Sequence, residues 1–388
     1  MLERRRFLAH SGSAAAMAAF LPAGLAPRTV AAGLVGDPDR ERAGDSGTPR
    51  SGLAMVWHDV AAWGVEGRGW ADTAAYYDRL PARAEGLVRD PVWQLSRHSA
   101  GMFASFETDA SEIQVRYTLR SDRLDMAHMP ATGVSGVDLY GLDGERWRWA
   151  AVFKPTGKAN EGSLIRNLDG GARAWRTYLP LYNGVESFEI GVPEGASFAP
   201  IAPRTAKPIA FYGTSILHGA CASRPGMAWP SIVGRRLGVP TLNLGFSGNG
   251  RMEPEIASLL AELDAAAFVI DCAPNMNGEQ ILERAGHLVR TLRAARPGAP
   301  IVLVEDRRYG YAWVQASARQ RNEGNREALR RVFEELRESG VPGLAYIETE
   351  RLLGADFGEA MTDGSHPNDL GMMRYADAVT PVLKGLLG

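Results

Sequence analysis

The 388-residue sequence predicts an α/β protein in which a β-rich half precedes a doubly wound parallel sheet. In the first half, short runs alternate apolar and polar residues between turns, as antiparallel strands do. After about residue 204, apolar runs alternate with stretches of helical length, which is the pattern of a parallel sheet with helices on both faces. We therefore expect a β-sandwich or jelly roll at 78–203 and an α/β domain at 204–388.

Composition places the chain among soluble globular proteins. Hydrophobic residues make up 45% and charged residues 23%, which is the usual range. The formal net charge is −2, so no basic field favours nucleic acid as a partner. The two cysteines, Cys221 and Cys272, are too few for a zinc site of their own. One disulfide is arithmetically possible, but we expect two buried free thiols.

The N-terminus has the features of an export signal. "MLERRRFLAHSGSAAAMAAFLPAGLA" begins with basic residues and continues with small and apolar ones. Arg4-Arg5-Arg6-Phe7-Leu8 fits the twin-arginine pattern. The apolar stretch is shorter than the ~20 residues of a membrane span, so we expect no stable membrane insertion. A disordered basic tail is the alternative.

We accordingly divide the N-terminal part into a twin-arginine-type signal at 1–32 and a linker with an N-terminal segment at 33–77. Small residues at 30–32 allow cleavage after Ala32. The polar stretch "GLVGDPDRERAGDSGTPR" then resembles a mobile linker. The expected location is the periplasm or the cell exterior.

Strands of the β-rich half are predicted from period-two runs such as "SAGMFASFETD", "EIQVRYTLR" and "VESFEIGV". Asp143-Gly144 lies between two further runs, which is a strong hairpin signal. In the α/β half, predicted strands cover 209–212, 240–245, 266–272, 299–304 and 344–347. Predicted helices lie near 226–237, 253–263, 278–296, 318–339 and 369–386. Five strands, each followed by a helix, favour a flavodoxin-like sheet.

Polar residues follow the apolar runs at the points where parallel strands should end. The relevant segments are "GTS" (213–215), "GFSGNG" (245–250), "DCAPNMN" (271–277), "EDRRY" (305–309) and "MTDGSHPNDLG" (361–371). Ligands of such sheets bind beyond the carboxyl ends of the strands. A serine, a glycine turn, an asparagine and an Asp-x-x-His should therefore meet on one rim. Together they are a set of groups suited to acyl transfer.

Each of these side chains has a predicted role. Ser215 is the nucleophile, and His366 is the base that takes its proton. Asp363 orients the His366 ring and stabilises its protonated form. The oxyanion is expected to bind the backbone N–H groups of Ser215 and Gly248 and the Asn275 amide. A helix beginning at Ser215 would add its N-terminal N–H groups, and Gly248 would offer an unobstructed approach.

Simpler explanations exist for each feature alone. A serine after an apolar run is often a helix N-cap, and Asp-Gly-Ser-His-Pro is an ordinary turn sequence. "GFSGNG" lacks the G-x-G-x-x-G order of a dinucleotide loop. The seven histidines are scattered without an H-E-x-x-H, so we expect no metal and no cofactor. The coincidence of all four features at strand ends favours the catalytic interpretation.

These residues resemble those of the SGNH, or GDSL-type, hydrolases. "GTSI" resembles the block with the nucleophile Ser215, "NLGFSGNG" the block with Gly248, "APNM" the block with Asn275, and "DGSH" the block with Asp363 and His366. The third block departs from the usual Gly-x-Asn-Asp. The G-x-S-x-G elbow of α/β-hydrolases is absent, since Leu217 occupies its last position.

The front half, with "GVDLY" at 136–140, is similar to a β-rich module that precedes some of these hydrolases. The resemblance implies a secreted bacterial serine esterase that removes O-acetyl groups from a polysaccharide or oligosaccharide through an acyl-enzyme, without cofactor. One alternative is a general short-acyl or lipolytic esterase. Another is a glycan-binding protein without catalysis. No residue pattern indicates an oligomeric state.

Further polar residues are candidates for substrate binding. Trp93, Arg97 and His98 in "WQLSRHSAG" and His128 in "MAHMPATG" could line the ester pocket, or could satisfy hydrogen bonds in turns and core. Glu305, at the fourth strand end, could line the cleft with its neighbours or join an ion-pair cluster. His218, near Ser215, is expected to pack rather than to act as a base.

Overall fold

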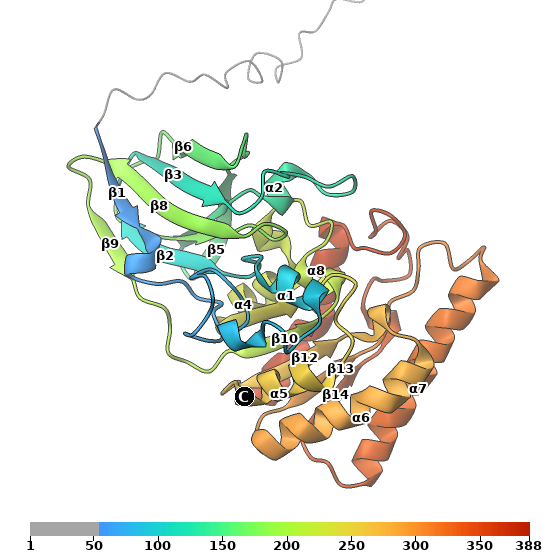
Figure 1. Ribbon diagram of the computed structural model, residues 1–388. Coiled ribbons are helices and arrows are strands. Elements are labelled where there is room, and N and C mark those ends of the chain that lie inside the picture. The colour runs from blue at the N-terminus through green and yellow to red at the C-terminus, as the bar shows by residue number, and fades with distance from the viewer. Residues whose placement is uncertain (1–53) are drawn as a thin grey trace, which may run out of the picture. The chain divides into compact units, whose positions relative to one another are not determined.

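The computed structural model describes residues 54–388, which Figure 1 colours from blue to red along the chain. The predicted export signal at 1–32 and the polar segment that follows it lie outside the described residues. The β-rich module and the α/β half belong to one compact unit.

The α/β half is built on a five-stranded parallel sheet. Its strands are β10 (Ile209–Gly213), β11 (Thr241–Gly245), β12 (Ala267–Asp271), β13 (Ile301–Val304) and β14 (Leu344–Ile347). They lie in the order β11-β10-β12-β13-β14, and every neighbouring pair is parallel. All five predicted strands and the flavodoxin-like order are confirmed.

Helices cover both faces of this sheet (Figure 1). One face packs against α5 (Pro254–Glu262), α6 (Gly278–Ala295) and α7 (Ala316–Glu338), and the other against α4 (Trp229–Leu237) and α8 (Asp369–Leu387). Strand residues alternate between the two cores: Phe268 and Ile270 belong to one, Val269 to the other. Because both faces are buried, the strands read as continuous apolar runs.

The chain reverses its direction of travel across the sheet between β10 and β12, since β11 lies outside β10. A crevice opens at such a point beyond the carboxyl ends of the two strands. Ser215 follows β10 and Asn275 follows β12. The topology alone therefore brings both residues to the crevice.

The N-terminal module is a sandwich of two antiparallel sheets. One contains β1 (Met55–Asp59), β8 (Val185–Pro193), β3 (Glu112–Leu119) and β6 (Ala159–Arg166) in this order. The other contains β5 (Arg146–Val152), β4 (Asp138–Asp143), β7 (Arg173–Tyr178), β2 (Phe103–Thr108) and β9 (Phe198–Ile201). Residues of both sheets share one apolar core. The predicted sandwich is confirmed.

Shorter elements connect these parts. They are α1 (Asp90–Ser96), α2 (Ala131–Val134), α3 (Ser215–His218) and the 3-10 turns Val60–Ala62, Ala82–Ala84, Pro225–Met227, Ala273–Asn275 and Thr349–Arg351. The predicted hairpin joins β4 to β5, with Asp143 paired to Arg146 and Gly144 in the left-handed region at φ 59°.

The extent of the module differs from the prediction, which assigned 33–77 to a linker and N-terminal segment. Residues 55–59 form β1 and pair with β8, and Val60, Val65 and Tyr77 enter the sandwich core. The segment "MVWHD" is one short alternating run beside a polar stretch, so its periodicity was too brief to indicate a strand.

Two buried polar residues join the module to the α/β half. The Arg79 guanidinium, 1% exposed, donates to the carbonyls of Asn243 (2.9 Å) and Gly245 (2.8 Å) on β11. Burial lowers the pKa of Arg79 to about 9. Asp138, in the "GVDLY" segment, accepts hydrogen bonds at 2.9 Å from Arg224 and from the Gly226 N–H. This segment thus anchors the loop that follows the nucleophile.

Candidate active site

Ser215 stands directly beyond the end of β10 with its hydroxyl free for chemistry. Thr214, not Ser215, caps the short helix α3, because its Oγ1 accepts from the Ile216 N–H at 3.3 Å. The Ser215 Oγ lies 2.9 Å from His366 Nε2. As the first helical residue, Ser215 keeps its N–H outside the intrahelical hydrogen bonds. The N-cap alternative is therefore wrong. Since α3 has four residues, the expected helix-end contribution to oxyanion binding is small.

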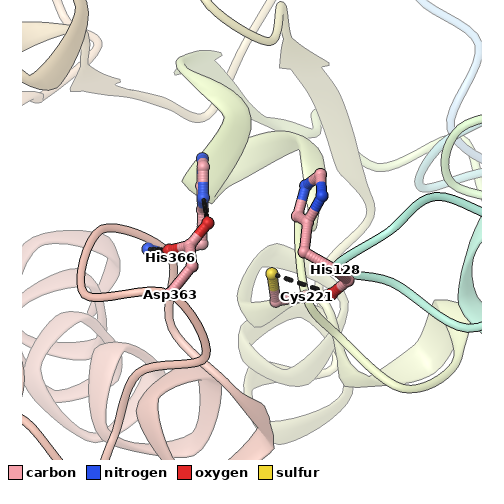
Figure 2. Close-up of side chains that lie close together, drawn as sticks. All are labelled: His128, Cys221, Asp363 and His366. Carbon is pink, nitrogen blue, oxygen red and sulfur yellow. Dashed lines mark hydrogen bonds and ion pairs between the residues drawn. The ribbon is translucent and has the colours of Figure 1, made fainter.

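His366 lies on a turn that also supplies its carboxylate partner. Asp363 Oδ2 is 2.7 Å from His366 Nδ1, and Asp363 Oδ1 accepts from the backbone N–H groups of Ser365 (2.9 Å) and His366 (2.8 Å). Figure 2 shows the two side chains joined in this way. Partial burial opposes ionisation, but these hydrogen bonds outweigh it and lower the pKa of Asp363. The turn therefore presents an ionised carboxylate to the imidazole.

The Asn275 amide faces the glycine turn that follows β11. Its oxygen accepts from the backbone N–H groups of Gly248 (3.3 Å), Asn249 (3.0 Å) and Gly250 (3.2 Å), an orientation assigned from these partners. The oxygen is thus fully used, and the NH₂ group is the part of the amide left for an oxyanion. Gly248 has φ +70°, and a Cβ there would meet nothing within 4 Å. The positive φ is therefore the reason for glycine at position 248. The expected reason, an unobstructed approach to the oxyanion, does not apply, because a side chain there would have room.

Gly248 is the less direct of the predicted oxyanion donors. Its N–H points at the Asn275 oxygen, although at 3.3 Å it makes the longest of the three hydrogen bonds. A developing oxyanion would have to share or take over this N–H. The role of Gly248 as a donor stays a prediction.

A buried polar network, which sequence reasoning missed, connects the Asn275 turn to the His366 turn. Arg307, 2% exposed, donates through Nε to the Ser365 carbonyl (3.0 Å) and through Nη1 to Asp306 Oδ1 (2.6 Å). The other Asp306 oxygen accepts from Asn325 (3.0 Å), which also donates to the Ala273 carbonyl (3.1 Å). The "EDRRY" segment signalled polar residues at a strand end, but not that they would be buried.

His128, from the β-rich module, lies beside the turn that carries His366, and its predicted role in substrate binding stays a prediction. Its ring lies 5.6 Å from that of His366, centroid to centroid, at an interplanar angle of 28°. Its carbonyl accepts a hydrogen bond from the Cys221 thiol at 3.3 Å. Figure 2 shows both residues beside the His366–Asp363 pair. The module therefore contributes to the surroundings of the base.

The same group offers four potential metal ligands. One atom each of His128, Cys221, Asp363 and His366 lies within 4.8 Å of the others. Both nitrogens of His366 already have partners, Ser215 and Asp363. Burial raises the pKa of the Cys221 thiol to about 11, whereas metals bind thiolates. The arrangement fits proton transfer better than metal binding.

A cavity of about 510 Å³ adjoins the glycine turn. Ser247 and Asn249 line it from the α/β half, and His98, Met126 and Tyr182 from the module side. The Tyr182 hydroxyl donates to the Ser215 carbonyl at 3.3 Å, which places this wall beside the nucleophile. The cavity therefore opens between the two halves of the chain next to the predicted oxyanion donors.

Of the other predicted pocket residues, only His98 lines this cavity. Burial, followed by the charges of Arg79 and Arg120, lowers the pKa of His98 to about 3, so its ring is neutral. Trp93 is 4% exposed within the α/β core and donates to Glu85 at 3.1 Å. A substrate-binding role for Trp93 is excluded by this burial, because its polar and apolar parts are both occupied.

Arg97 and Glu305 are likewise engaged in structural ion pairs. Arg97 pairs with Asp78 at 2.6 Å and lies over the Trp93 ring. Glu305 is fully buried and accepts from Arg330 (2.9 Å) and Arg326 (3.1 Å). The ion-pair alternative is thus the right one for Glu305, although the carboxylate itself is buried and only its arginine partners reach the surface.

His218 and the cysteines follow the predictions. The His218 ring is fully buried, stacks on Tyr182 at 4.1 Å and bonds to the Leu181 carbonyl at 2.7 Å. Cys221 and Cys272 are both free and buried. Within residues 54–388, no helix has the length and apolar character needed to cross a membrane.

Comparisons with known protein families and solved structures show which proteins this chain resembles. Residues 206–384 match the GDSL-like lipase/acylhydrolase family, and residues 55–198 match the family described as the N-terminus of SGNH-hydrolase-type esterases. A crystal structure of a GDSL-like lipase from Bacteroides ovatus is 33% identical, with a TM-score of 0.82, over 86% of this chain and 98% of that one. The chain therefore belongs to the GDSL/SGNH hydrolase family, in the branch with the "GVDLY"-type N-terminal module.

More distant structures share the fold. A salicylyl-acyltransferase from a tetracycline biosynthetic pathway is 19% identical, with a TM-score of 0.67, over 87% of this chain and 98% of that one. A family two carbohydrate esterase from Clostridium thermocellum, in complex with cellohexaose, is 15% identical, with a TM-score of 0.53, over 74% and 93%. Among curated proteins, no sequence matches.

Proposed function

We propose that this protein is a serine esterase that removes O-acetyl groups from a carbohydrate polymer through an acyl-enzyme. The observation that carries the proposal is the chain of contacts from Ser215 Oγ to His366 Nε2 (2.9 Å) and from His366 Nδ1 to Asp363 (2.7 Å). Such a relay converts a weak hydroxyl nucleophile into one that attacks esters at neutral pH. Neither contact needs a bound ligand to form.

The proposed reaction has two halves. Ser215 Oγ attacks the ester carbonyl carbon while His366 Nε2 takes the hydroxyl proton. His366 then gives this proton to the alcohol oxygen as the bond between the acyl carbon and that oxygen breaks. A water molecule, losing its proton to His366, attacks the acyl-Ser215 ester. Acetate leaves as Ser215 regains its proton, and the oxyanion in both halves is stabilised by the Ser215 N–H and the Asn275 amide.

Carbohydrate as the alcohol is supported by the family and by fold neighbours. The two-part layout of module and hydrolase resembles that of esterases acting on acetylated polysaccharides. One structure with the same fold holds cellohexaose, although its identity of 15% supports likeness of fold alone. The module also brings His128 beside His366, the residue that must meet the alcohol oxygen.

Acetate release from a panel of acetylated xylan, glucomannan and cellulose oligomers tests the proposal. We expect release by the wild type and none above background by Ser215→Ala. p-Nitrophenyl acetate is the polymer-free control. Turnover of p-nitrophenyl acetate without acetate release from any polymer would reject the carbohydrate polymer as the substrate, but would support the esterase activity. If neither substrate reacts, a glycan-binding protein without catalysis is the remaining interpretation.

An esterase for longer acyl groups is a second candidate, because the 510 Å³ cavity beside the glycine turn is larger than an acetyl group requires. Leu95, Met126 and Val134 give this cavity an apolar part. A series of p-nitrophenyl esters from acetate to octanoate separates the two candidates. A kcat/KM that falls with chain length supports the acetyl esterase, and one that rises supports the second.

The location is part of the proposal. The arginine pair and apolar stretch at 1–32 support export by a twin-arginine route to the periplasm or the medium. Replacing Arg4 and Arg5, the two arginines that precede the variable residue, Phe7 and Leu8, by lysine should leave the precursor in the cytoplasm. Fractionation of the producing cells checks this, and normal export of the doubly substituted protein would reject it.

A further inference from the structure

The loop between β13 and α7 exposes three large apolar side chains within four residues. Trp313 is 75% exposed, the highest value for any large apolar side chain in the described part of the chain, and Val314 (57%) and Tyr311 (36%) accompany it. Single exposed apolar residues are normal, but a cluster of them marks a contact surface. Tryptophan in particular offers a large rigid face with little conformational entropy to lose.

This loop is fixed against the catalytic turn. The Gly310 N–H donates to the Gly364 carbonyl at 2.7 Å. The Tyr311 ring lies so close to Gly364 that a Cβ there would come within 2.7 Å of it. Gly364 is two residues from His366, so the loop and the base share one rigid support.

The backbone around Trp313 is held in place as well. Arg319, in the first turn of α7, donates to the carbonyls of Ala312 (2.7 Å) and Trp313 (3.2 Å). An exposed side chain on a loop fixed at both ends is already positioned for contact. Binding through Trp313 would therefore cost little ordering of the protein.

Trp313 is one wall of a cavity of about 350 Å³, a size within the range of small-ligand sites. Phe357 gives it a second aromatic side chain, and Arg308, Arg319 and Glu323 give it charged hydrogen-bonding groups. Covering these charged groups with an acyl chain would remove the water that solvates them, which is costly. A sugar ring suits the cavity, because its C–H face can stack on an aromatic ring while its hydroxyl groups bond the polar side chains.

The position of the cavity is compatible with binding of the alcohol part of the ester, which is the sugar polymer. His366 Nε2 must reach the oxygen of the leaving alcohol, so the esterified sugar lies against the turn that carries His366. A neighbouring sugar of the same polymer then extends along the loop docked on that turn. We infer that the cavity walled by Trp313 is a subsite for a neutral sugar residue of the polymer backbone. This inference rests on the proposed function.

Kinetics on two substrates test the subsite. We expect Trp313→Ala to raise KM for the best acetylated polymer by about three- to tenfold, which is what one lost aromatic contact gives. Its kcat/KM for p-nitrophenyl acetate should stay within about twofold, since the small ester does not reach the loop. Trp313→Phe should recover most of the loss, and Val314→Ala, at an exposed neighbouring residue outside the cavity lining, should behave as wild type.

Direct binding separates failure of the subsite from failure of the proposed activity. Calorimetry with xylohexaose, mannohexaose and cellohexaose is performed on Ser215→Ala and on Ser215→Ala/Trp313→Ala. The inference predicts binding of at least one oligosaccharide by the first protein and its loss in the second, whether or not any polymer is deacetylated. Equal binding by both, or no binding by either, would overturn it.

Discussion

The Arg307 guanidinium donates two hydrogen bonds to Ser365, the residue immediately before His366. Nε bonds the Ser365 carbonyl at 3.0 Å, and Nη2 bonds its hydroxyl. Arg307 is therefore a positioning residue, because it acts on the base only through the turn. Its second partner, Asp306, also supports the turn of Asn275 through Asn325.

Arg307→Lys should lower kcat by about 10–100-fold with little change in KM. Lysine keeps the positive charge next to Asp306 but cannot donate to both the carbonyl and the hydroxyl of Ser365 as the guanidinium does. The acidic limb of the pH–rate profile should also move, because the His366–Asp363 contact changes. Steady-state kinetics and thermal unfolding of the variant measure the two effects separately.

Arg331→Lys is the matched control, because Arg331 is exposed on α7, pairs with Glu335 at 2.8 Å and lines neither cavity. We expect wild-type kinetics from it on p-nitrophenyl acetate. A normal kcat and pH profile in Arg307→Lys would show that the Arg307–Ser365 contact is structural only.

The Asp363 carboxylate predicts the shape of the pH dependence. Its lowered pKa keeps it ionised through the range in which an imidazole titrates. The acidic limb of kcat/KM should therefore follow one proton, with no second proton from Asp363. Asp363→Asn should reduce kcat on the order of 10³–10⁴-fold, because the amide no longer stabilises the protonated ring. An acidic limb that needs two protons would contradict this assignment.

Asn275 has an observed contact with the glycine turn and a predicted role as an oxyanion donor, and two variants separate them. Asn275→Ala removes the oxyanion donor and the acceptor for the glycine turn, so we expect about 10²–10³-fold lower kcat together with a lower Tm. Asn275→Asp keeps the acceptor oxygen and should retain more of the stability while losing as much activity. The pair of variants is compared by kinetics and thermal unfolding. Full activity in Asn275→Asp would reject the amide as a donor.

Asp271, at the end of β12, links stability to pH. It is fully buried, and its carboxyl oxygens have no hydrogen-bond partner among residues 54–388. Burial, reinforced by the nearby charge of Asp306, raises its pKa well above the ordinary value, against the opposing charge of Arg307. The folded state therefore holds a neutral carboxyl where the unfolded chain ionises.

Stability from this neutral group is fully present below the ordinary carboxyl pKa and is lost as the pH rises through the folded-state pKa. Asp271→Asn carries no such ionisation. The Tm of Asp271→Asn should thus rise relative to the Tm of the wild type as the pH is raised from about 5 to about 9. Thermal unfolding across this range measures the difference, and a gap that is constant with pH would contradict a neutral Asp271.

The sequence predicts the sheet well, and with it part of the grouping of the candidate site residues, for a physical reason. Parallel strands bring their carboxyl ends to one edge, so Ser215, directly after β10, and Asn275, after β12, could be grouped from the order of the apolar runs. Approximate strand bounds sufficed for these two residues. His366 lies well beyond the end of β14, and its place was predicted from the Asp-x-x-His segment before the last helix.

The missed residues depend on contacts that no local pattern encodes. Arg79 resembles a surface charge in the sequence, yet it is buried against carbonyls of β11, more than 160 residues away. Glu305 and Arg307 likewise read as rim residues, and only their partners on α7 and on the His366 turn show that they are internal. Trp313 carries no periodic signal because it lies in a loop.

Locating the acyl group during turnover tests whether Ser215 is the nucleophile. Wild-type protein is mixed with p-nitrophenyl acetate, quenched in acid within the first turnovers and digested for mass spectrometry. We predict one acetyl group on the peptide containing Ser215, together with a burst of p-nitrophenol, and neither in Ser215→Ala. Turnover by Ser215→Ala at the wild-type rate, or an acetyl group on another residue, would contradict the central claim that Ser215 is the nucleophile.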